Sequence, residues 1–404
     1  MSWPLVPLKE LVEQATGGAS LKRDQFTAKG LSVIPKKAIS SAIDIPNDKF
    51  VFTTEAVFES FSRSVVDENF VVTTLRDLVP SGPNLGRICN ISQAGSYLLA
   101  QGVHAFKLLD GLNPRYLAYV SNSKEFRSQV LRIKVGSTQV HARSSEYQKI
   151  VIPVPPLEEQ IRIAAILDKA DAIRRKRQQA IELADQFLKS VFLDMFGDPV
   201  TNPKGWEVRA LKDIARIQIG PFGTQLHKSD YIEGGIPLIN PTHIVNGKIV
   251  PSSSLTISNA KFVGLSEYHL ELGDIIMGRR GEMGRCALVT ERERGWMCGT
   301  GSLYIRSEQR GAFLQYLFGL LTGSAVKAYL ESESLGATLP NLNKAIVGSI
   351  AVPIPRDEVL DKYMDIRAKT MELQRKEDLL DRTELFEALA QAAFKGELTS
   401  IKAA

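Results

Sequence analysis

Cysteine is scarce in this sequence and long hydrophobic runs are absent, and both absences exclude classes of protein. The 404 residues include only Cys89, Cys286 and Cys298. Three scattered cysteines are too few for a disulfide framework and too far apart for a zinc site, so we expect reduced, buried thiols and no metal. No window approaches about 18 consecutive apolar residues, and the first residues lack a basic segment followed by an apolar run. We therefore expect a cytoplasmic protein that does not cross a membrane.

The motifs of several enzyme classes are also missing. The single Gly-Lys pair, Gly247-Lys248, is not followed by Ser or Thr, which rules out a phosphate-binding loop. Gly299-Thr-Gly301 lacks the third glycine of a dinucleotide fingerprint, and Asn240-Pro241 continues with Thr242 rather than with the second proline of an adenine methyltransferase. The five histidines do not follow zinc-protease spacing, and no Gly-x-Ser-x-Gly elbow occurs. We expect no catalytic residue and no cofactor in this chain.

What the sequence does contain is a long internal repeat. Residues 3–12 resemble 206–215, 115–119 resemble 312–316, 136–139 resemble 336–339, and 152–155 resemble 352–355. The four matches keep the same order at offsets of 197 to 203 residues. Because solenoid repeats are only about 20 to 50 residues long, this period indicates a duplicated domain.

Each copy is predicted to be a mixed α/β domain followed by a long helix. Short β-branched runs lie between Gly, Pro and Asn at 50–52, 70–74, 236–239 and 274–277, and helical patterns cover 114–130 and 312–331. The predicted organisation is a first globular domain at 1–150, its helix at 151–197, a second globular domain at 198–352 and its helix at 353–404.

The two connecting helices are the clearest elements in the sequence. Residues 158–196 and 357–395 contain no Pro or Gly, and each segment is followed by a glycine. The first carries a 4-3 stripe that is apolar except at Arg177, namely Ile166, Ala170, Ile173, Arg177, Ala180, Ala184, Phe187 and Val191. The second carries Val359, Tyr363, Ile366, Leu373 and Leu380 before its register shifts to Leu385, Leu389 and Ala392. Such stripes are typical of helices that pack against another helix.

Antiparallel pairing of these helices would bring Arg177 close to Glu377 or Asp378. An ion pair there would fix the register, although exposed pairs contribute only about 0 to 1 kcal/mol. The alternative, in which residues 174–177 form a solvated basic face, stays open.

Positive charge is concentrated in the globular segments. The net charge of +5 divides into +5, 0, +2 and −2 over residues 1–150, 151–197, 198–352 and 353–404. The segments 82–87 and 279–285 combine glycine with arginine, and 136–143 and 336–343 are rich in polar side chains that can read base edges. These segments are candidates for DNA contact, and plain surface turns are the alternative.

Five segments carry a resemblance to a known family. They are Ile152-Pro-Val-Pro-Pro-Leu-Glu-Glu-Gln160 before the first long helix, residues 187–197 at its end, and residues 220–231, 235–240 and 272–276 in the second copy. Together they resemble the specificity subunit of type I restriction–modification systems. The first copy departs from the pattern, since it lacks a clear counterpart of residues 273–276 and of the Gly-Ile-Pro segment. The second helix begins with Arg356-Asp-Glu-Val where the family usually shows Pro-Leu-x-Glu-Gln.

The resemblance implies a fold and a function. The fold would be two α/β target recognition domains, each followed by a long helix, with the helices pairing as an antiparallel coiled coil of pseudo-twofold symmetry. The chain would be a non-catalytic subunit that directs methyltransferase and restriction subunits to a bipartite, asymmetric site on double-stranded DNA. Two methyltransferase subunits would use S-adenosylmethionine, and the restriction (translocase) subunits would use ATP and magnesium.

Candidate residues follow from the loops and stripes. For DNA contact they are Lys22, Arg23, Arg87, Thr138, Gln139, His141, Arg143, Gln225, Lys228, Asn240, Thr242, Arg279, Arg280, Arg285, Thr338, Asn341 and Asn343. For helix pairing or partner contact they are Ile166, Ala170, Ile173, Arg177, Phe187, Ile366, Leu373, Glu377 and Leu380. Two other functions remain open, namely a restriction or modification enzyme fragment with a diverged catalytic part, and a scaffold that dimerises through its long helices.

Overall fold

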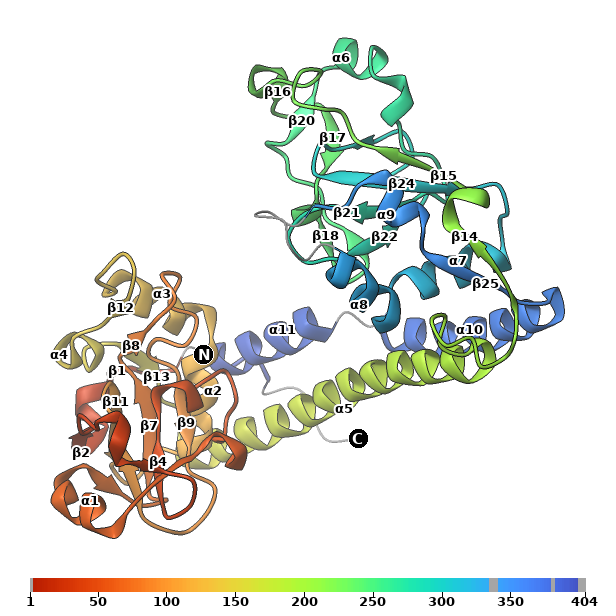
Figure 1. Ribbon diagram of the computed structural model, residues 1–404. Helices are drawn as coiled ribbons and strands as arrows, with labels where there is room; N and C mark the ends of the chain where they lie inside the picture. The colour runs from red at the N-terminus through yellow and green to blue at the C-terminus, as the bar shows by residue number, and fades with distance from the viewer. Residues whose placement is uncertain (1–2, 334–340, 379–381, 399–404) are drawn as a thin grey trace. The chain divides into compact units, whose positions relative to one another are not determined.

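The computed structural model describes residues 3–333, 341–378 and 382–398, with the side chains of 376–384 left out. The chain divides into two compact units (Figure 1). The first holds residues up to Gln179 and those from Leu379 onward, and the second holds Ala180–Asp378. The division falls within the longest helix, α5 (Leu157–Phe196), which therefore contributes one half to each unit.

The globular part of the first unit is built from short strands and helices. The strands are β1 Leu5–Pro7, β2 Val12–Gly17, β3 Phe26–Thr27, β4 Leu31–Ile34, β5 Val51–Thr53, β6 Val65–Val66, β7 Phe70–Thr74, β8 Arg76–Asp77, β9 Ile88–Asn90, β10 Tyr97–Leu99, β11 Val103–Leu108, β12 Val140–His141 and β13 Val151–Pro153. The helices are α1 Glu55–Ser60, α2 Pro114–Asn122, α3 Lys124–Arg132 and α4 Ser144–Tyr147.

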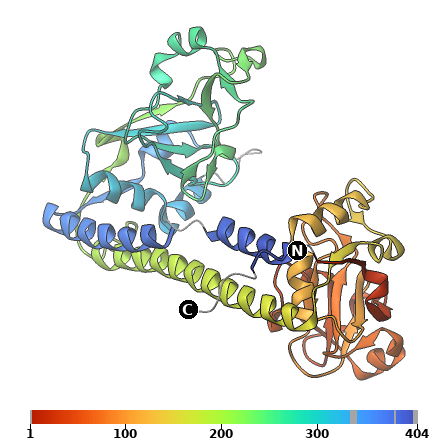
Figure 2. The same cartoon turned by 180° about the vertical axis from the view of Figure 1, so that it is seen from behind.

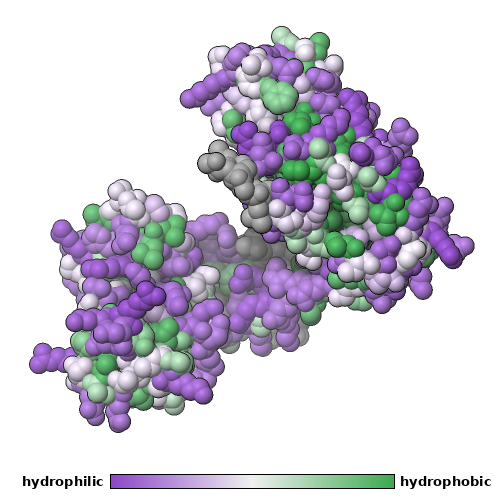
Figure 3. Space-filling model, viewed as in Figure 1, coloured by the Kyte–Doolittle hydropathy of each residue, from purple (hydrophilic) through white to green (hydrophobic). Residues whose placement is uncertain are grey.

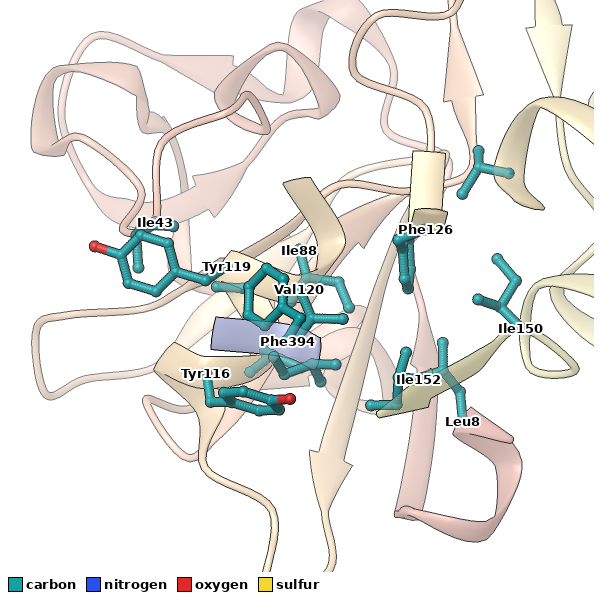
Figure 4. Close-up of a cluster of buried hydrophobic side chains, with 14 of the residues drawn as sticks. Leu8, Ile43, Ile88, Tyr116, Tyr119, Val120, Phe126, Ile150, Ile152 and Phe394 are labelled. Atoms are coloured by element: carbon teal, nitrogen blue, oxygen red, sulfur yellow. The ribbon is translucent and has the colours of Figure 1, made fainter. Parts of the chain in front are cut away.

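Two sheets form the body of this unit. One is antiparallel in the order β2-β11-β7-β9, and the other runs β3-β5-β4-β10-β6 with β4 and β10 parallel. Alternation along β7 sends Val72 into the core that includes residues of both sheets, while Val71 faces the opposite core beneath α2 and α3. Figure 4 shows this second core, where Tyr116 of α2 lies beside Phe394 of α11 (Arg382–Lys395) at a ring distance of 5.8 Å.

The second unit repeats these elements. Its strands are β14 Glu207–Ala210, β15 Ala215–Ile219, β16 Tyr231–Ile232, β17 Ile236–Ile239, β18 Ile244–Val245, β19 Lys248–Ile249, β20 Thr256–Ile257, β21 Ile275–Gly278, β22 Cys286–Leu288, β23 Met297–Cys298, β24 Ser302–Ser307 and β25 Ala351–Ile354. Its helices are α6 Asn259–Val263, α7 Ala312–Leu321, α8 Ser324–Glu333, α9 Lys344–Gly348 and α10 Asp357–Asp378.

Strand order shows that the two globular parts are copies of one fold. The sheet β15-β24-β21-β22 repeats β2-β11-β7-β9, and β16-β20-β17-β23 repeats β3-β5-β4-β10 including its one parallel pair. The first copy lacks a clear sequence counterpart of residues 273–276 and of the Gly-Ile-Pro segment, yet it has the corresponding strands, with β7 in the place of β21 and β4 in the place of β17.

Each predicted helix before the connectors is interrupted in the structure. The pattern at 114–130 divides into α2 and α3 at Ser123, which is extended and accepts a hydrogen bond from the Phe126 amide at 3.2 Å. The pattern at 312–331 divides into α7 and α8, with Gly323 between them. An N-cap serine ends one helix and begins the next without interrupting the apolar periodicity, which is why the pattern alone indicated one helix.

The mixed α/β class and the long helix after each domain are confirmed. Helix α5 ends at Phe196, and Gly197 follows in the left-handed region at φ +81°. The second connector was predicted as one helix. The structure describes two helices there, because α10 ends at Asp378 and α11 begins at Arg382. Its predicted stripe residue Leu380 lies outside the described residues, as does the side chain of Glu377.

Within each unit, half of α5 packs against a later helix in antiparallel direction (Figures 1 and 2). In the first unit, Arg174 lies 5.6 Å above the ring of Phe386, and Arg162 donates to the Leu398 carbonyl at 3.5 Å. In the second, Gln374 donates to Asp185 at 2.8 Å, and the rings of Phe192 and Tyr363 lie 5.7 Å apart. In each unit a later residue of α5 contacts an earlier residue of its partner, which fixes the antiparallel direction.

The buried face of α5 differs from the predicted stripe. Ile173 and Phe187 are 49% and 51% exposed, and Leu373 of α10 is 65% exposed. The fully buried positions of α5 include Ile163 and Leu167, which belong to the core of the first globular domain. Helix pairing within the units does not bury these three residues, because α5 buries a face against its own domain as well as against a helix. Their assignment to helix pairing or partner contact stays a prediction.

Four other candidates for helix pairing or partner contact are partly buried. They are Ile166, Ala170, Arg177 and Ile366.

Candidate nucleic-acid interface

A small ribbon in the first domain aligns exposed side chains from three separate segments. Strand β8 pairs with β12 so that Arg76 lies opposite His141, and His141 in turn bridges Val135 on its other side. Directly paired residues of antiparallel strands point to the same face. Arg76, His141 and Val135 are all exposed, whereas the alternate residues Asp77 and Val140 are buried. The ribbon therefore presents one row of side chains to solvent.

The neighbouring loop holds Arg87 against the protein. Its Nε donates to the Pro83 carbonyl at 2.7 Å, and a second nitrogen donates to Asn122 of α2. Burial lowers the pKa of Arg87. Gly86 precedes it at φ +72°, and a Cβ at that position would lie 2.8 Å from the ring of Tyr147. Arg87 thus holds the loop through two hydrogen bonds.

The second domain joins its equivalent segments by the same backbone hydrogen bond as the first domain, but with different side chains. The Leu342 amide donates to the Arg279 carbonyl at 3.0 Å, just as the Ala142 amide donates to the Leu75 carbonyl at 3.0 Å in the first domain. The Arg279 side chain is 7% exposed and returns a bond from Nε to the Leu342 carbonyl at 2.7 Å, and burial lowers its pKa. Its neighbour Arg280 is exposed. Arg279 therefore supports the loop, and Arg280 extends from it.

Residues after β17 complete this side of the second domain. The Asn240 side-chain oxygen accepts from the Gly301 amide at 3.2 Å, and a Cβ on Gly299 would lie 2.4 Å from that oxygen. The glycines of Gly299-Thr-Gly301 thus make room for Asn240, a role the sequence did not reveal. Arg285 reaches the Pro241 carbonyl at 3.3 Å, which brings the two loops together.

Several candidate residues also form hydrogen bonds within the protein. Asn343 caps α9 by accepting from the Ile346 amide at 2.9 Å, and Gln225 accepts from the Tyr268 hydroxyl at 2.9 Å. Arg285 donates to Glu282 at 2.7 Å. These bonds orient the side chains and leave part of each polar group accessible.

Other candidates are plainly exposed. They are Lys22, Arg23, Thr138, Gln139, Arg143, Lys228, Thr242 and Asn341, while Thr338 lies outside the described residues. Lys22 and Arg23 lie at the short helix η2 (Arg23–Gln25), the counterpart of η7 (Lys228–Asp230) where Lys228 lies. These three residues are separated in sequence from the ribbon and loop candidates.

Sequence reasoning missed two informative residues. Arg76 was not selected because its partner His141 lies far along the chain, and only strand pairing brings them together. Gln160 belongs to the segment that carries the family resemblance. It is fully buried and donates to the Gly111 and Pro155 carbonyls at 2.9 and 2.8 Å. It ties α5 to the loop before α2.

Other kinds of site receive no support from the described part of the chain. Within it, no group of three or more His, Cys, Asp or Glu side chains is arranged to hold a metal ion. The three cysteines are free and buried, and burial raises the pKa of Cys89 to about 11. Among the same residues, no helix is long and apolar enough to cross a membrane.

The two units define a duplicated recognition protein, in which one α/β fold presents two different sets of polar side chains. The model of the type I restriction modification DNA specificity domain matches residues 2–183 and 203–374, and the chain belongs to this family. Its role is DNA target specificity within a type I restriction–modification system, and it is the non-catalytic component that recognises DNA.

Individual relatives agree along most of the chain. The MjaIX specificity subunit of Methanocaldococcus jannaschii is 24% identical over 388 residues, which cover 89% of this chain and 85% of that protein. The MjaVIII specificity subunit of the same organism is 24% identical over 78% of this chain and 80% of that protein.

Solved structures share the fold. The S subunit of a type I system from M. genitalium superposes with a TM-score of 0.57 at 15% identity, over 98% of this chain and 96% of that one. A chain from a structure of type I complex assembly and conformational transition superposes with a TM-score of 0.54 at 17% identity, over 98% of both chains.

Proposed function

We propose that each globular domain reads one half of a bipartite, asymmetric DNA target and that the chain directs methyltransferase and restriction subunits to it. The supporting observation is that equivalent positions in the two copies carry different exposed side chains. With the Leu75–Ala142 and Arg279–Leu342 bonds as reference, His141 corresponds to Asn341. Different donors and acceptors on one scaffold select different base edges, so the half-sites differ.

Affinity in this proposal comes largely from phosphate contacts. The exposed cations on the two domains include Arg23 and Arg143 in the first and Lys228 and Arg280 in the second. Neutralising phosphates releases counterions, so binding weakens steeply with salt, whereas contacts to base edges set the sequence.

The long helices have two proposed roles. They set the length of the unread spacer between the half-sites, and they bind two methyltransferase subunits. Ile173 and Phe187 are about half exposed on α5, and Leu373 is exposed on α10. Large apolar side chains that are exposed on helices can form a surface that contacts a partner protein. The methyltransferase subunits would bring S-adenosylmethionine, and the restriction subunits ATP and magnesium, all in the cytoplasm.

The proposal is tested by reconstitution. Full-length chain alone, methyltransferase subunits alone, and both together are incubated with DNA and labelled S-adenosylmethionine. We expect methyl transfer only in the combined sample and only at a bipartite sequence. Transfer by the chain alone, or identical methylation without it, would contradict the proposal.

A further inference from the structure

An exposed apolar tip lies within the basic interface of the first domain. Leu78 and Val79 directly follow β8 and are 56% and 47% exposed. Val135, in the same ribbon, is 52% exposed. Lys134 donates to the Pro80 carbonyl at 2.8 Å, which joins the two segments. Figure 3 shows apolar side chains among hydrophilic ones on the part of this unit where Figure 1 labels α3 and β12. We name Leu78, Val79 and Val135 the apolar tip.

The two segments that carry this tip are basic. The segments 76–87 and 131–143 contain five arginines and lysines, namely Arg76, Arg87, Arg132, Lys134 and Arg143. Their only carboxylate is Asp77, which is buried and accepts from the Val79 and Asn84 amides at 3.1 and 2.9 Å. An apolar tip on basic segments complements a polyanion that carries an apolar group between its phosphates.

We propose that the apolar tip packs against the C5 methyl group of a thymine in the half-site read by the first domain, an inference that rests on the proposed function. A β-ribbon fits the major groove, where the thymine methyl is the apolar feature of the base edges. The tip follows Arg76 on such a ribbon, so cations reaching the phosphates would hold it over the bases.

The equivalent loop of the second domain has a different character. It is shorter and runs Arg280-Gly281-Glu282, and the apolar residue that follows, Met283, is only 4% exposed. The two domains thus differ in the chemistry at this position, and Leu78 and Val79 act as specificity residues of the first domain alone.

The test uses uracil, which pairs as thymine does but lacks the methyl group. The first domain's half-site is identified as the one whose sequence relaxes in His141→Ala, because His141 is assigned to base edges. Each thymine of the duplex is then replaced singly by uracil, and affinity is measured for the full-length chain with its methyltransferase subunits. We expect one position in that half-site at which uracil weakens binding about three- to tenfold.

The variants make the test specific. L78S/V79S should bind the thymine duplex about three- to tenfold more weakly and lose its response to uracil at that one position. Its response to uracil in the other half-site should stay unchanged. The control V200S/V208S replaces two exposed valines outside the interface and should behave like the natural chain.

The outcomes separate this inference from the proposed function. A half-site without thymine, or equal uracil responses of L78S/V79S and the natural chain, would overturn the thymine contact while leaving bipartite recognition intact. Absence of any sequence-specific binding by the complex would overturn the proposed function, and this inference with it.

Discussion

At the scale of single residues, adjacent arginines in the second domain have opposite roles. Arg279 is buried and bonded to the Leu342 carbonyl, and Arg280 is exposed beside it. We predict that Arg279→Ala lowers the free energy of unfolding by about 1–3 kcal/mol, because the loop loses a charged donor. Arg280→Ala should leave the unfolding temperature unchanged and reduce the slope of log affinity against log salt by about 1.

Thermal unfolding and a salt titration of DNA binding check both variants. Arg294→Ala, an exposed arginine of the same domain whose side chain pairs with Glu291, serves as the control. Equal loss of stability in the Arg279 and Arg280 variants would refute the assigned roles.

The cysteines give a second prediction at this scale. All three thiols are buried, and burial raises the pKa of Cys89 to about 11 and that of Cys286 to about 12. Because the thiolate is the reactive form, roughly one Cys89 in a thousand is ionised at pH 8 in the folded protein, and burial also keeps the reagent from the sulfur. We predict no reaction with a disulfide reagent in the native protein and three equivalents in urea. Rapid labelling before unfolding would contradict the described cores.

At the scale of elements, α5 is anchored differently in each unit. In the first, Asp168 accepts from Arg115 at 2.6 Å and from the Tyr119 hydroxyl at 2.7 Å. In the second, Phe192 stacks on Tyr316 with ring centroids 5.6 Å apart. One anchor depends on charged hydrogen bonds and the other on aromatic packing.

The polar anchor is tested by Asp168→Asn. The amide keeps the size but loses the charge, so we expect the first unit to lose about 1–2 kcal/mol of stability. Asp194→Asn, at an exposed position of the same helix, should have no measurable effect. Hydrogen exchange of the α2 backbone amides measures the stability of the first unit. Unchanged protection in Asp168→Asn would show that this network does not hold α5.

The aromatic anchor predicts that Gly319→Ala destabilises the second unit, although alanine favours a helix more than glycine does. Gly319 lies within α7, and a Cβ there would be 2.7 Å from the ring of Phe192. Alanine gains about 1 kcal/mol of helix propensity, but overpacking costs about 1–3 kcal/mol, so Gly319→Ala should be destabilising overall. In the Phe192→Leu background, Gly319→Ala should lower the free energy of unfolding by a smaller amount. A double-mutant cycle measured by urea unfolding gives this difference. Additive effects would mean that the ring does not limit this position.

The elements also show what the sequence could predict. Helix α5 was predictable because 158–196 contains no Pro or Gly, whereas the break at Ser123 was hidden by a residue that both ends and caps a helix. In the interface, Arg280 followed from a glycine–arginine loop, but Arg76 did not, since its place depends on pairing with the distant strand β12. Local patterns predict elements, and long-range pairing decides which side chains meet.

At the scale of the whole molecule, the family and the duplication imply one chain with two different recognition domains. Each half of α5 finds its antiparallel partner within the same chain, through Phe386 in the first unit and Gln374 in the second. We therefore predict that the isolated chain is a monomer by light scattering. An obligate dimer would show that the helices pair between chains.

The most direct test of the central claim is sequencing of methylated adenines in host DNA, with the gene intact, deleted, or carrying Asn341→Ala. The account predicts a bipartite, asymmetric methylated motif that disappears on deletion. In the Asn341→Ala strain, only the half-site read by the second domain should relax, because Asn341 is assigned to base edges. A motif that survives deletion, or one continuous symmetric motif, would contradict the account.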